Sequence, residues 1–381
     1  MRVRDLVRAM ESIAPPALAE SWDRVGLHVG HANADLTGAI LLTIDLTEAV
    51  VEEAVAAKAS AVVAYHPPIW QPISRLTGST RTQRVVMSLL EHGIAVYSPH
   101  TALDAAGGGV TDWLCEGLSG VPNVHEAGDC RALSPHEDHE PPRVKIVTFV
   151  PEDHAEQVRN AMATAGAGLI GDYRVCSFAS PGVGTFLGGE GTNPAVGEAG
   201  RLERVQELRL EMIADASAAA LVCDTLRRFH PYEEPAIDLI PLTPEPRRAV
   251  GAGRRLVLDT PATAHELAER LRGHLDKSRL KFALPEGVST EHKITTVGVC
   301  PGAGGELAAA ARAEGCELFV TGEMKHHEVL AAMDNGMGVL LAGHTNTERG
   351  YLPRLADRLR GELVGVEVMV CERDMDPLTY V

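Results

Sequence analysis

The chain has 381 residues, of which 45% are hydrophobic and 23% charged, as in soluble globular proteins of two or three domains. The formal net charge of −17 argues against a broad surface for nucleic-acid phosphates, which usually needs a basic patch. The basic residues of RRLVLD (254–259) are mixed with apolar ones and are interpreted as a solvated face. Aromatic residues make up only 4%, which favours α/β packing.

The seven cysteines are odd in number and lack CxxC spacing, so free thiols in a reducing compartment are predicted, and we expect a cytoplasmic location. The first stretch, MRVRDLVRAMESIAPP, has the pattern of an amphipathic helix rather than the apolar core of a signal peptide. No apolar run approaches the ~20 residues that span a bilayer. We therefore expect no membrane partner.

The first part of the chain alternates strand-like and helix-like stretches. Strands are predicted at 38–47, 60–68 and 94–100, and helices at 48–59 and 82–93. The strands are nearly continuous apolar runs, which indicates a mostly parallel sheet that is buried on both faces.

Two stretches without hydrophobic periodicity, 125–143 and 243–249, are rich in charge and proline and are predicted to be linkers. Residues 144–242, which lie between them, show strand, helix and strand followed by a second strand, helix and strand. This order predicts a small ferredoxin-like α+β domain. It is inserted into an α/β core formed by residues 1–124 and 250–381, where the alternation of helix and strand resumes.

Four predicted strands end in side chains that can bind metal ions or move protons. In α/β sheets, ligands bind at the carboxyl ends of strands. A single histidine at a strand end more often satisfies a backbone group than binds a metal, but four such ends from both halves of the chain are hard to ascribe to chance. The residues concerned are His66, His100, Asp104, Glu323, His344 and Glu348.

The spacing of these residues carries further information. His344 and Glu348 are four residues apart, so they would share one face of a helical turn, and His100 and Asp104 repeat that spacing. Imidazole and carboxylate ligands suit zinc, iron or manganese, and the lack of cysteine ligands favours a catalytic site. Two acids would also allow a bridged metal pair that activates water. We expect one or two divalent ions per chain.

Two other motifs have more than one interpretation. The stretch VGVCPGAGGELAAAA could present backbone amides to a phosphate, although Leu307 replaces the third glycine of a nucleotide-binding motif. In the insert, a polar cluster follows a helix and could gate a cavity, or could cap that helix and pair strands. This cluster comprises His230, Tyr232, Glu233 and Glu234.

Several blocks, in this order, resemble the NIF-three-like dinuclear metal-centre family, whose members are labelled GTP cyclohydrolase I type 2 homologues: SWDRVGLHVG, AYHPPIW, SPHTALDAAGGGVTDWL, TGEMKHHEVL and AGHTNTERGYL. The insert resembles the PII/CutA-like domain that some members carry, through GTFLGGEGTNPAVGEAG, VQELRLEMI and HPYEEPAIDLIPL. The resemblance implies a two-lobed α/β core, a toroidal homohexamer and a pair of divalent metals that face its internal cavity.

The metal motifs of that family fall on four residues here, namely His66, Asp104, His344 and Glu348. Many members have two adjacent histidines where this chain has Tyr65 and His66. Tyrosine is a poor ligand for most divalent ions unless it is ionised. One of the two metals would then be loosely held or absent, or His100 would take the position.

The sequence supports three hypotheses about the function, to different degrees. The first is a metal-dependent hydrolase of the GTP cyclohydrolase I type 2 kind, acting on a nucleotide-like or phosphorylated small molecule, with His100 or Glu323 moving the proton. The second is a metal-binding regulatory or scaffold protein without catalysis, whose insert senses a small molecule or gates the cavity. The third, a nucleic-acid-processing factor, is disfavoured by the charge of −17. A coordination position open to water would support the enzyme.

Overall fold

The computed structural model describes five stretches of the chain, 1–119, 129–136, 142–243, 250–276 and 279–378. The chain divides into two compact units. The core unit comprises Met1–His136 with Arg247–Val381, and the inserted unit comprises Glu137–Pro246. None of the helices in the described stretches combines the length and apolar character needed to cross a membrane.

The first sheet of the core unit has the strand order β1-β4-β3-β2-β17. Its strands are β1 (Gly26–Val29), β2 (Ile40–Thr43), β3 (Ala61–Ala64), β4 (Ala95–Ser98) and β17 (Val368–Val370). All pairs are parallel except β1 with β4 at one edge. Every residue of β2, β3 and β4 is buried, as expected for strands that are covered on both faces.

The second sheet of the core unit has the strand order β13-β16-β15-β14-β12-β5. Its strands are β5 (Cys130–Arg131), β12 (Arg254–Ala262), β13 (Lys281–Ala283), β14 (Ile294–Cys300), β15 (Leu318–Thr321) and β16 (Gly338–Leu341). The central strands β14, β15 and β16 are parallel, and the outer pairs are antiparallel. The predicted two-lobed, mostly parallel core is confirmed, with antiparallel strands added at the edges.

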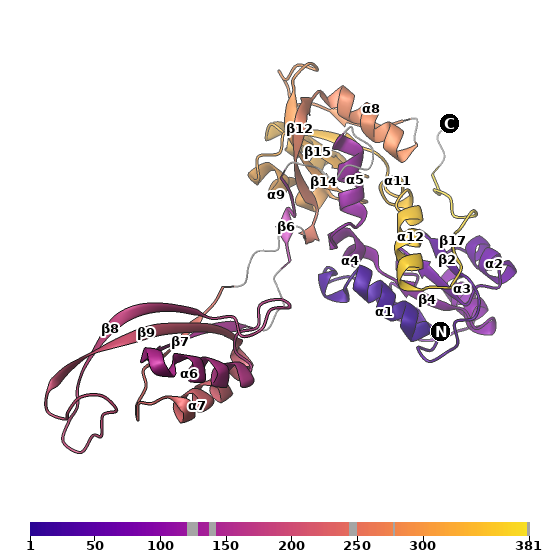
Figure 1. Cartoon of the computed structure of the whole chain (residues 1–381). Helices are drawn as coiled ribbons and strands as arrows, with labels where there is room; N and C mark the ends of the chain where they lie inside the picture. Colours follow the sequence, from indigo (N-terminus) through magenta and orange to yellow (C-terminus); the bar gives the residue numbers. More distant parts are fainter. Residues whose placement is uncertain (120–128, 137–141, 244–249, 277–278, 379–381) are drawn as a thin grey trace. The chain divides into compact units, whose positions relative to one another are not determined.

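Helices cover both faces of each sheet (Figure 1). One hydrophobic cluster joins the two sheets through α1, α5, α8 and α12, while α2 and α3 cover the far face of the first sheet, and α9 and α10 that of the second. The helices are α1 (Val3–Ile13), η1 (Pro16–Leu18), α2 (Glu48–Ala56), α3 (Arg81–Glu91), α4 (His100–Ala105), α5 (Val110–Ser119), α8 (Ala264–Leu275), η3 (Gly305–Leu307), α9 (Ala308–Ala313), α10 (His326–Asp334), α11 (Asn346–Arg349) and α12 (Leu352–Glu362).

Arg254, at the start of β12, corrects the interpretation of RRLVLD as a solvated face, because its side chain is fully buried. Its Nε atom lies 2.5 Å from Asp112 Oδ1, and its Nη1 atom donates to the carbonyls of Gly251 and Gly253 at 2.8 Å. Its Nη2 atom reaches the carbonyl of Ala105 at the end of α4. A buried guanidinium is tolerated when its donors are paired in this way. Arg254 thereby ties α4 and α5 to the second sheet.

The inserted unit is an antiparallel sheet of order β10-β7-β9-β8 with two helices on one face. Its elements are β7 (Arg143–Val150), α6 (Glu152–Thr164), β8 (Phe178–Leu187), β9 (Leu202–Asp215), η2 (Ala216–Ala218), α7 (Ala219–Phe229) and β10 (Ile237–Pro241). This is the ferredoxin-like arrangement that the sequence predicts. The sequence order requires a strand in the place of β8 but does not locate it, because the proline and glycines of β8 interrupt the apolar alternation.

Part of the predicted linker 125–143 is structured. There β5 pairs with β12, and β6 (Ser134–Pro135) pairs with β11 (Gly251–Ala252). β5 therefore extends the second sheet at the edge of β12, while β6 and β11 form a separate two-stranded sheet. Residues 125–128 and 137–141 of this linker, and 244–249 of the second, lie outside the described residues.

Candidate metal centre

Three residues that are distant in sequence meet at the carboxyl ends of two strands. His66 follows β3 of the first sheet, and His344 follows β16 of the second, while Glu348 lies in α11. Their ligand atoms all lie within 4.8 Å of one another. The strands therefore deliver two imidazoles and a carboxylate to one point, as the strand-end pattern predicts.

Glu348 is the central member of this group, and it is only 3% exposed. Its Oε2 atom lies 3.5 Å from Nε2 of His66, and its Oε1 atom lies 3.5 Å from Nε2 of His344. The Oε2 atom is buried without a hydrogen-bond partner. A buried carboxylate oxygen without a partner is costly. Its position between two imidazole nitrogens is therefore suited to a cation.

A carboxylate anchors each imidazole from behind. Nδ1 of His66 lies 2.9 Å from Oδ1 of Asp45, and Nδ1 of His344 lies 2.9 Å from Oε1 of Glu323. A proton on each Nδ1 leaves the lone pair of Nε2 directed towards Glu348. Histidines that bind metals are commonly oriented by such a carboxylate.

The charges at the site favour a cation. Burial lowers the pKa of His66, but the hydrogen bond to Asp45 and the nearby carboxylate of Glu348 outweigh burial and raise it to about 10. Protonated His66 thus provides the positive charge that the two carboxylates require. A divalent ion would meet the same requirement by taking the place of that proton.

Tyr65 and Asp104 form a buried pair beside this group. The Tyr65 hydroxyl donates to Oδ1 of Asp104 at 2.5 Å. Burial and the negative charges of Asp104 and Glu348 raise the pKa of Tyr65 well above its usual value, so its phenol stays neutral and acts as a donor. Burial raises the pKa of Asp104 to about 7, against the opposing effect of the Tyr65 hydrogen bond. Asp104 is not part of the three-residue group, and its role as a metal ligand stays a prediction.

His100, at the start of α4, lies next to the group. Its ring centroid is 5.4 Å from that of His66, and Nδ1 contacts Oδ1 of Asp23 at 2.7 Å. Its Nε2 atom makes no hydrogen bond to the residues that the structure describes. His100 also has a φ of +32°, a backbone conformation that is rare for residues other than glycine and is often found at functional sites. The rings of Trp22 and Trp70 are each 6.0 Å from His100.

Gly302 completes the surroundings of Glu348. A Cβ atom at this position would lie 2.8 Å from Oε1 of Glu348 and 3.3 Å from Nε2 of His344. Its φ of +59° also favours glycine. The amide nitrogens of Gly302 and Gly304 donate to the hydroxyls of Thr347 and Thr321, at 2.9 and 3.0 Å. The glycine-rich turn therefore encloses the candidate metal centre, and these two amides are not available to a phosphate.

Sequence analysis missed three contributors to the site, Asp23, Asp45 and Gly302. Asp45 follows β2, and Gly302 follows β14, so the strand-end rule would have found both had it been applied to every strand. Asp23 lies in a loop, and no local signal marks it. The two adjacent histidines of the TGEMKHHEVL block, His326 and His327, are both exposed.

The donor set fits a divalent ion such as zinc, iron or manganese, because it joins two neutral imidazole nitrogens with a buried carboxylate. His66, His344 and Glu348 would hold the ion, while Asp45 and Glu323 fix the two rings.

Comparison with known proteins identifies the family of the chain. The family model of Duf34/NIF3 (NGG1p interacting factor 3) matches residues 1–377. The chain belongs to this family. Among its curated relatives, the GTP cyclohydrolase 1 type 2 homolog of Bacillus subtilis is 32% identical over 380 residues, which cover 99% of this chain and 98% of the relative. The human NIF3-like protein 1 is 31% identical over 389 residues, which cover 100% of this chain and 93% of that protein.

Solved structures of NIF3-related proteins have the same architecture. A Bacillus cereus protein related to NIF3 is 32% identical, with a TM-score of 0.69, and the match covers 100% of this chain and 99% of that one. Reduced HcgD from Methanocaldococcus jannaschii shares the fold at 16% identity, with a TM-score of 0.55 and coverage of 98% of both chains. The family resemblance that was drawn from the sequence blocks is confirmed.

Proposed function

We propose that this NIF3 family member binds one or two divalent metal ions and is a metal-dependent hydrolase of a nucleotide-like or phosphorylated small molecule. The observation that supports this most is the buried carboxylate of Glu348, which lies between two imidazoles that carboxylates hold in place. A divalent ion at such a site supplies Lewis-acid chemistry, because it acidifies water and polarises the bond under attack.

The residues around the site can hold and move a proton. Oδ1 of Asp23 accepts a hydrogen bond from Nδ1 of His100. Nε2 of His100 is therefore the atom that exchanges a proton with substrate or water. Glu323 is occupied at Oε1 by His344, which favours an orienting role for Glu323 over the proton transfer that the sequence suggests.

The first substrate to test is GTP, because the relative from Bacillus subtilis is named a GTP cyclohydrolase 1 type 2 homolog. We further propose that copies of the chain assemble into a homohexamer, as the family resemblance implies. Light scattering on the purified protein would measure its mass.

The first test is metal content per chain by elemental analysis, on protein that is purified without a chelator. Glu348→Gln should lose the metal, and His100→Gln should keep it. A metal-loaded parent should then hydrolyse GTP or another phosphorylated compound. Both variants should be inactive, Glu348→Gln because it lacks the metal and His100→Gln because it lacks the group that moves the proton. A parent that binds no metal while folded would refute the metal centre. A loaded parent without activity on any such compound would refute the hydrolase.

The second candidate is a metal-binding regulatory or scaffold protein without catalysis. It is favoured by one observation, a cavity in the inserted unit that is separate from the candidate metal centre. Activity that depends on His100 would decide against it.

A further inference from the structure

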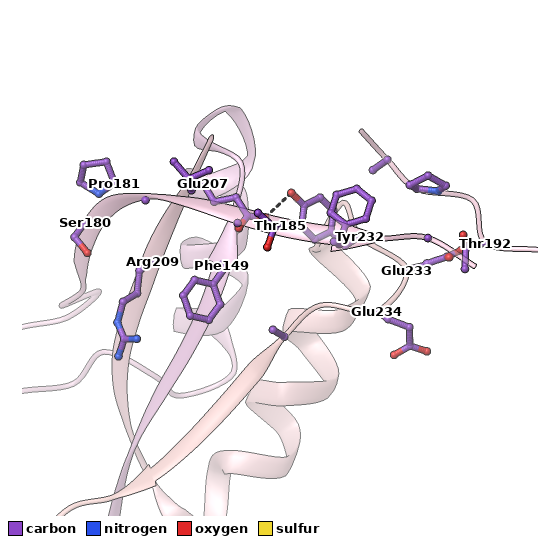
Figure 2. Close-up of a pocket in the computed structure, with 18 residues that line it drawn as sticks. Phe149, Ser180, Pro181, Thr185, Thr192, Glu207, Arg209, Tyr232, Glu233 and Glu234 are labelled. Carbon is purple, nitrogen blue, oxygen red and sulfur yellow. Dashed lines mark hydrogen bonds between the residues drawn. The ribbon is translucent and has the colours of Figure 1, made fainter. Parts of the chain in front are cut away.

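The inserted unit has a cavity of about 610 Å³, within the usual range for small-molecule sites (Figure 2). It lies on the face of the sheet that the helices leave uncovered. Ile146 of β7 and Leu210 of β9 belong to the core beneath α6 and α7. Side chains alternate along a strand, so Phe149 and Arg209 point to the opposite face, where they line the cavity.

One side of the cavity is the stretch 180–184 of β8, where the residues that face the cavity are small. On β8, Ser180, Gly182 and Gly184 face the cavity, and Gly182 is paired with Glu207 of β9. Gly182 has no positive φ, and a Cβ atom there would meet nothing within 4 Å. Neither the backbone nor a neighbouring residue therefore requires glycine. Glycine inside a strand weakens it and often marks a position that a ligand approaches closely.

The opposite side of the cavity is fixed by the loop that follows α7. The Tyr232 hydroxyl donates to Oε1 of Glu207 at 2.6 Å (Figure 2). The Tyr232 amide donates to Nδ1 of His230 at 3.1 Å, and Nε2 of His230 donates to the carbonyl of Phe149 at 3.1 Å. These contacts hold Tyr232 over the sheet and give the polar cluster after α7 a structural role. The cavity is thus shaped before any ligand enters.

The charges that line the cavity are mainly negative. They are the carboxylates of Glu207, Glu233 and Glu234, against one guanidinium, that of Arg209. Nε of Arg209 lies 2.8 Å from Oε1 of Glu211, a carboxylate that Lys145 also contacts, so three carboxylates of the lining stand against one guanidinium that is already paired. A concave surface with this excess of one sign attracts ions of the opposite sign. The ligand should therefore be a cation.

The remaining lining decides which kind of cation fits. Among the described residues, the group of side chains arranged to hold a metal ion lies in the core unit and includes no residue of this cavity. The cavity instead combines carboxylates with the rings of Phe149, Phe186 and Tyr232. Aromatic faces attract organic ammonium groups and also bury apolar surface.

We propose that this cavity is a binding site for a small organic cation, an amine with an apolar or aromatic body. The ammonium group lies near Glu207 and Glu233, and the body of the molecule lies over Gly182. The site is separate from the candidate metal centre and does not depend on it.

Three probes that share one indole body test the charge preference by calorimetry on the full-length protein. Tryptamine is a cation, tryptophol is neutral and indole-3-acetate is an anion. We expect tryptamine to bind once per chain, tryptophol to bind at least about tenfold more weakly, and indole-3-acetate not to bind. The affinity for tryptamine should be the same with and without a chelator. No binding of tryptamine, or equal binding of tryptophol, would overturn the proposal.

Two variants test the location. Gly182→Val fills the space over β8 and should abolish tryptamine binding. Glu233→Gln removes a charge but keeps an oxygen for the amide of Asn193, and should weaken binding about tenfold. Glu156→Gln, on the exposed side of α6, is the matched control and should bind like the parent. Parent-like affinity in Glu233→Gln would overturn the proposal even if Gly182→Val fails to fold.

A competing occupant is a second copy of the chain seated on the open face of the sheet. In that case tryptamine would not bind, and Gly182→Val would lower the mass of the assembly in light scattering. This pair of results would overturn the small-molecule site.

Discussion

Replacing Gly302 by alanine should weaken metal binding, although Gly302 supplies no ligand atom. The new Cβ atom would lie 2.8 Å from Oε1 of Glu348 and 3.3 Å from Nε2 of His344, both closer than ordinary contact. Glu348 would have to move away from the two imidazoles. Displacing a ligand in this way should lower metal affinity by about 10- to 100-fold, similar to the loss of an orienting residue.

The substitution has a second effect that must be separated from the first. Gly302 has a φ of +59°, and alanine in this conformation costs roughly 1–2 kcal/mol of folding free energy. Gly315 has a φ of +78° with nothing within 4 Å of a Cβ atom, so Gly315→Ala provides the same backbone strain far from any contact. In the presence of a chelator, Gly302→Ala should lose at least as much stability as Gly315→Ala, because the clash with Glu348 adds to the same backbone strain.

Competition titrations with a chromogenic zinc chelator would measure metal affinity, and denaturant unfolding with a chelator would measure stability. We expect only Gly302→Ala to lose metal affinity. If both variants lose the same stability and both bind zinc like the parent, Glu348 is not a metal ligand. If both lose metal affinity equally, the effect is global and the geometric argument fails.

Three further predictions concern residues around the core. Glu323→Gln should lower metal affinity about 10- to 100-fold, because the ring of His344 loses its anionic anchor. Arg254→Met should destabilise the core unit by about 3–5 kcal/mol in denaturant unfolding, because it leaves Asp112 without its buried partner. In His274→Phe, the free energy of unfolding should decrease less than in the parent as the pH falls below 6.5. Burial lowers the pKa of His274 below 6.5, so stability is intact above pH 6.5 and falls as pH decreases towards the folded-state pKa.

Each of these has a result that would contradict it. Unchanged zinc affinity in Glu323→Gln would show that the carboxylate does not orient the ring. A loss below about 1 kcal/mol in Arg254→Met would mean that the ion pair gives no net stability. An unchanged slope between pH 6.5 and 5 in His274→Phe would assign the acid sensitivity to other groups, such as His28, whose pKa is also lowered by burial.

The strand-end rule predicted most of the candidate site from sequence. His66 follows β3 of the first sheet, and His344 and Glu348 follow β16 of the second, so the rule places them at the carboxyl ends of two sheets but does not show that these ends meet. The rule could not show that Tyr65 is a neutral donor, because its state depends on burial and on the charge of Asp104. Nor could it show that Glu323 contacts His344, which requires knowing how two loops meet.

The fold was predictable where apolar periodicity is strong, as in β2, β3 and β4, whose residues are all buried. It was not predictable where tertiary contacts override local pattern. Arg254 appears solvated in sequence because Asp112 and the carbonyl of Ala105, which pair with it, are more than 100 residues away in the chain. The strand β8 has glycines and a proline within its run, and they interrupt the apolar pattern that would locate it in the sequence.

The position of β17 has a consequence for synthesis on the ribosome. This strand, Val368–Val370, pairs with β2 of the first sheet, although more than 300 residues separate them in the chain. The first sheet therefore keeps an open edge at β2 while the inserted unit and the second sheet are translated. Aggregation through that edge is a hazard during this interval, which gives nascent chains a reason to need chaperones. The candidate metal centre is also completed late, because His344 and Glu348 emerge long after His66.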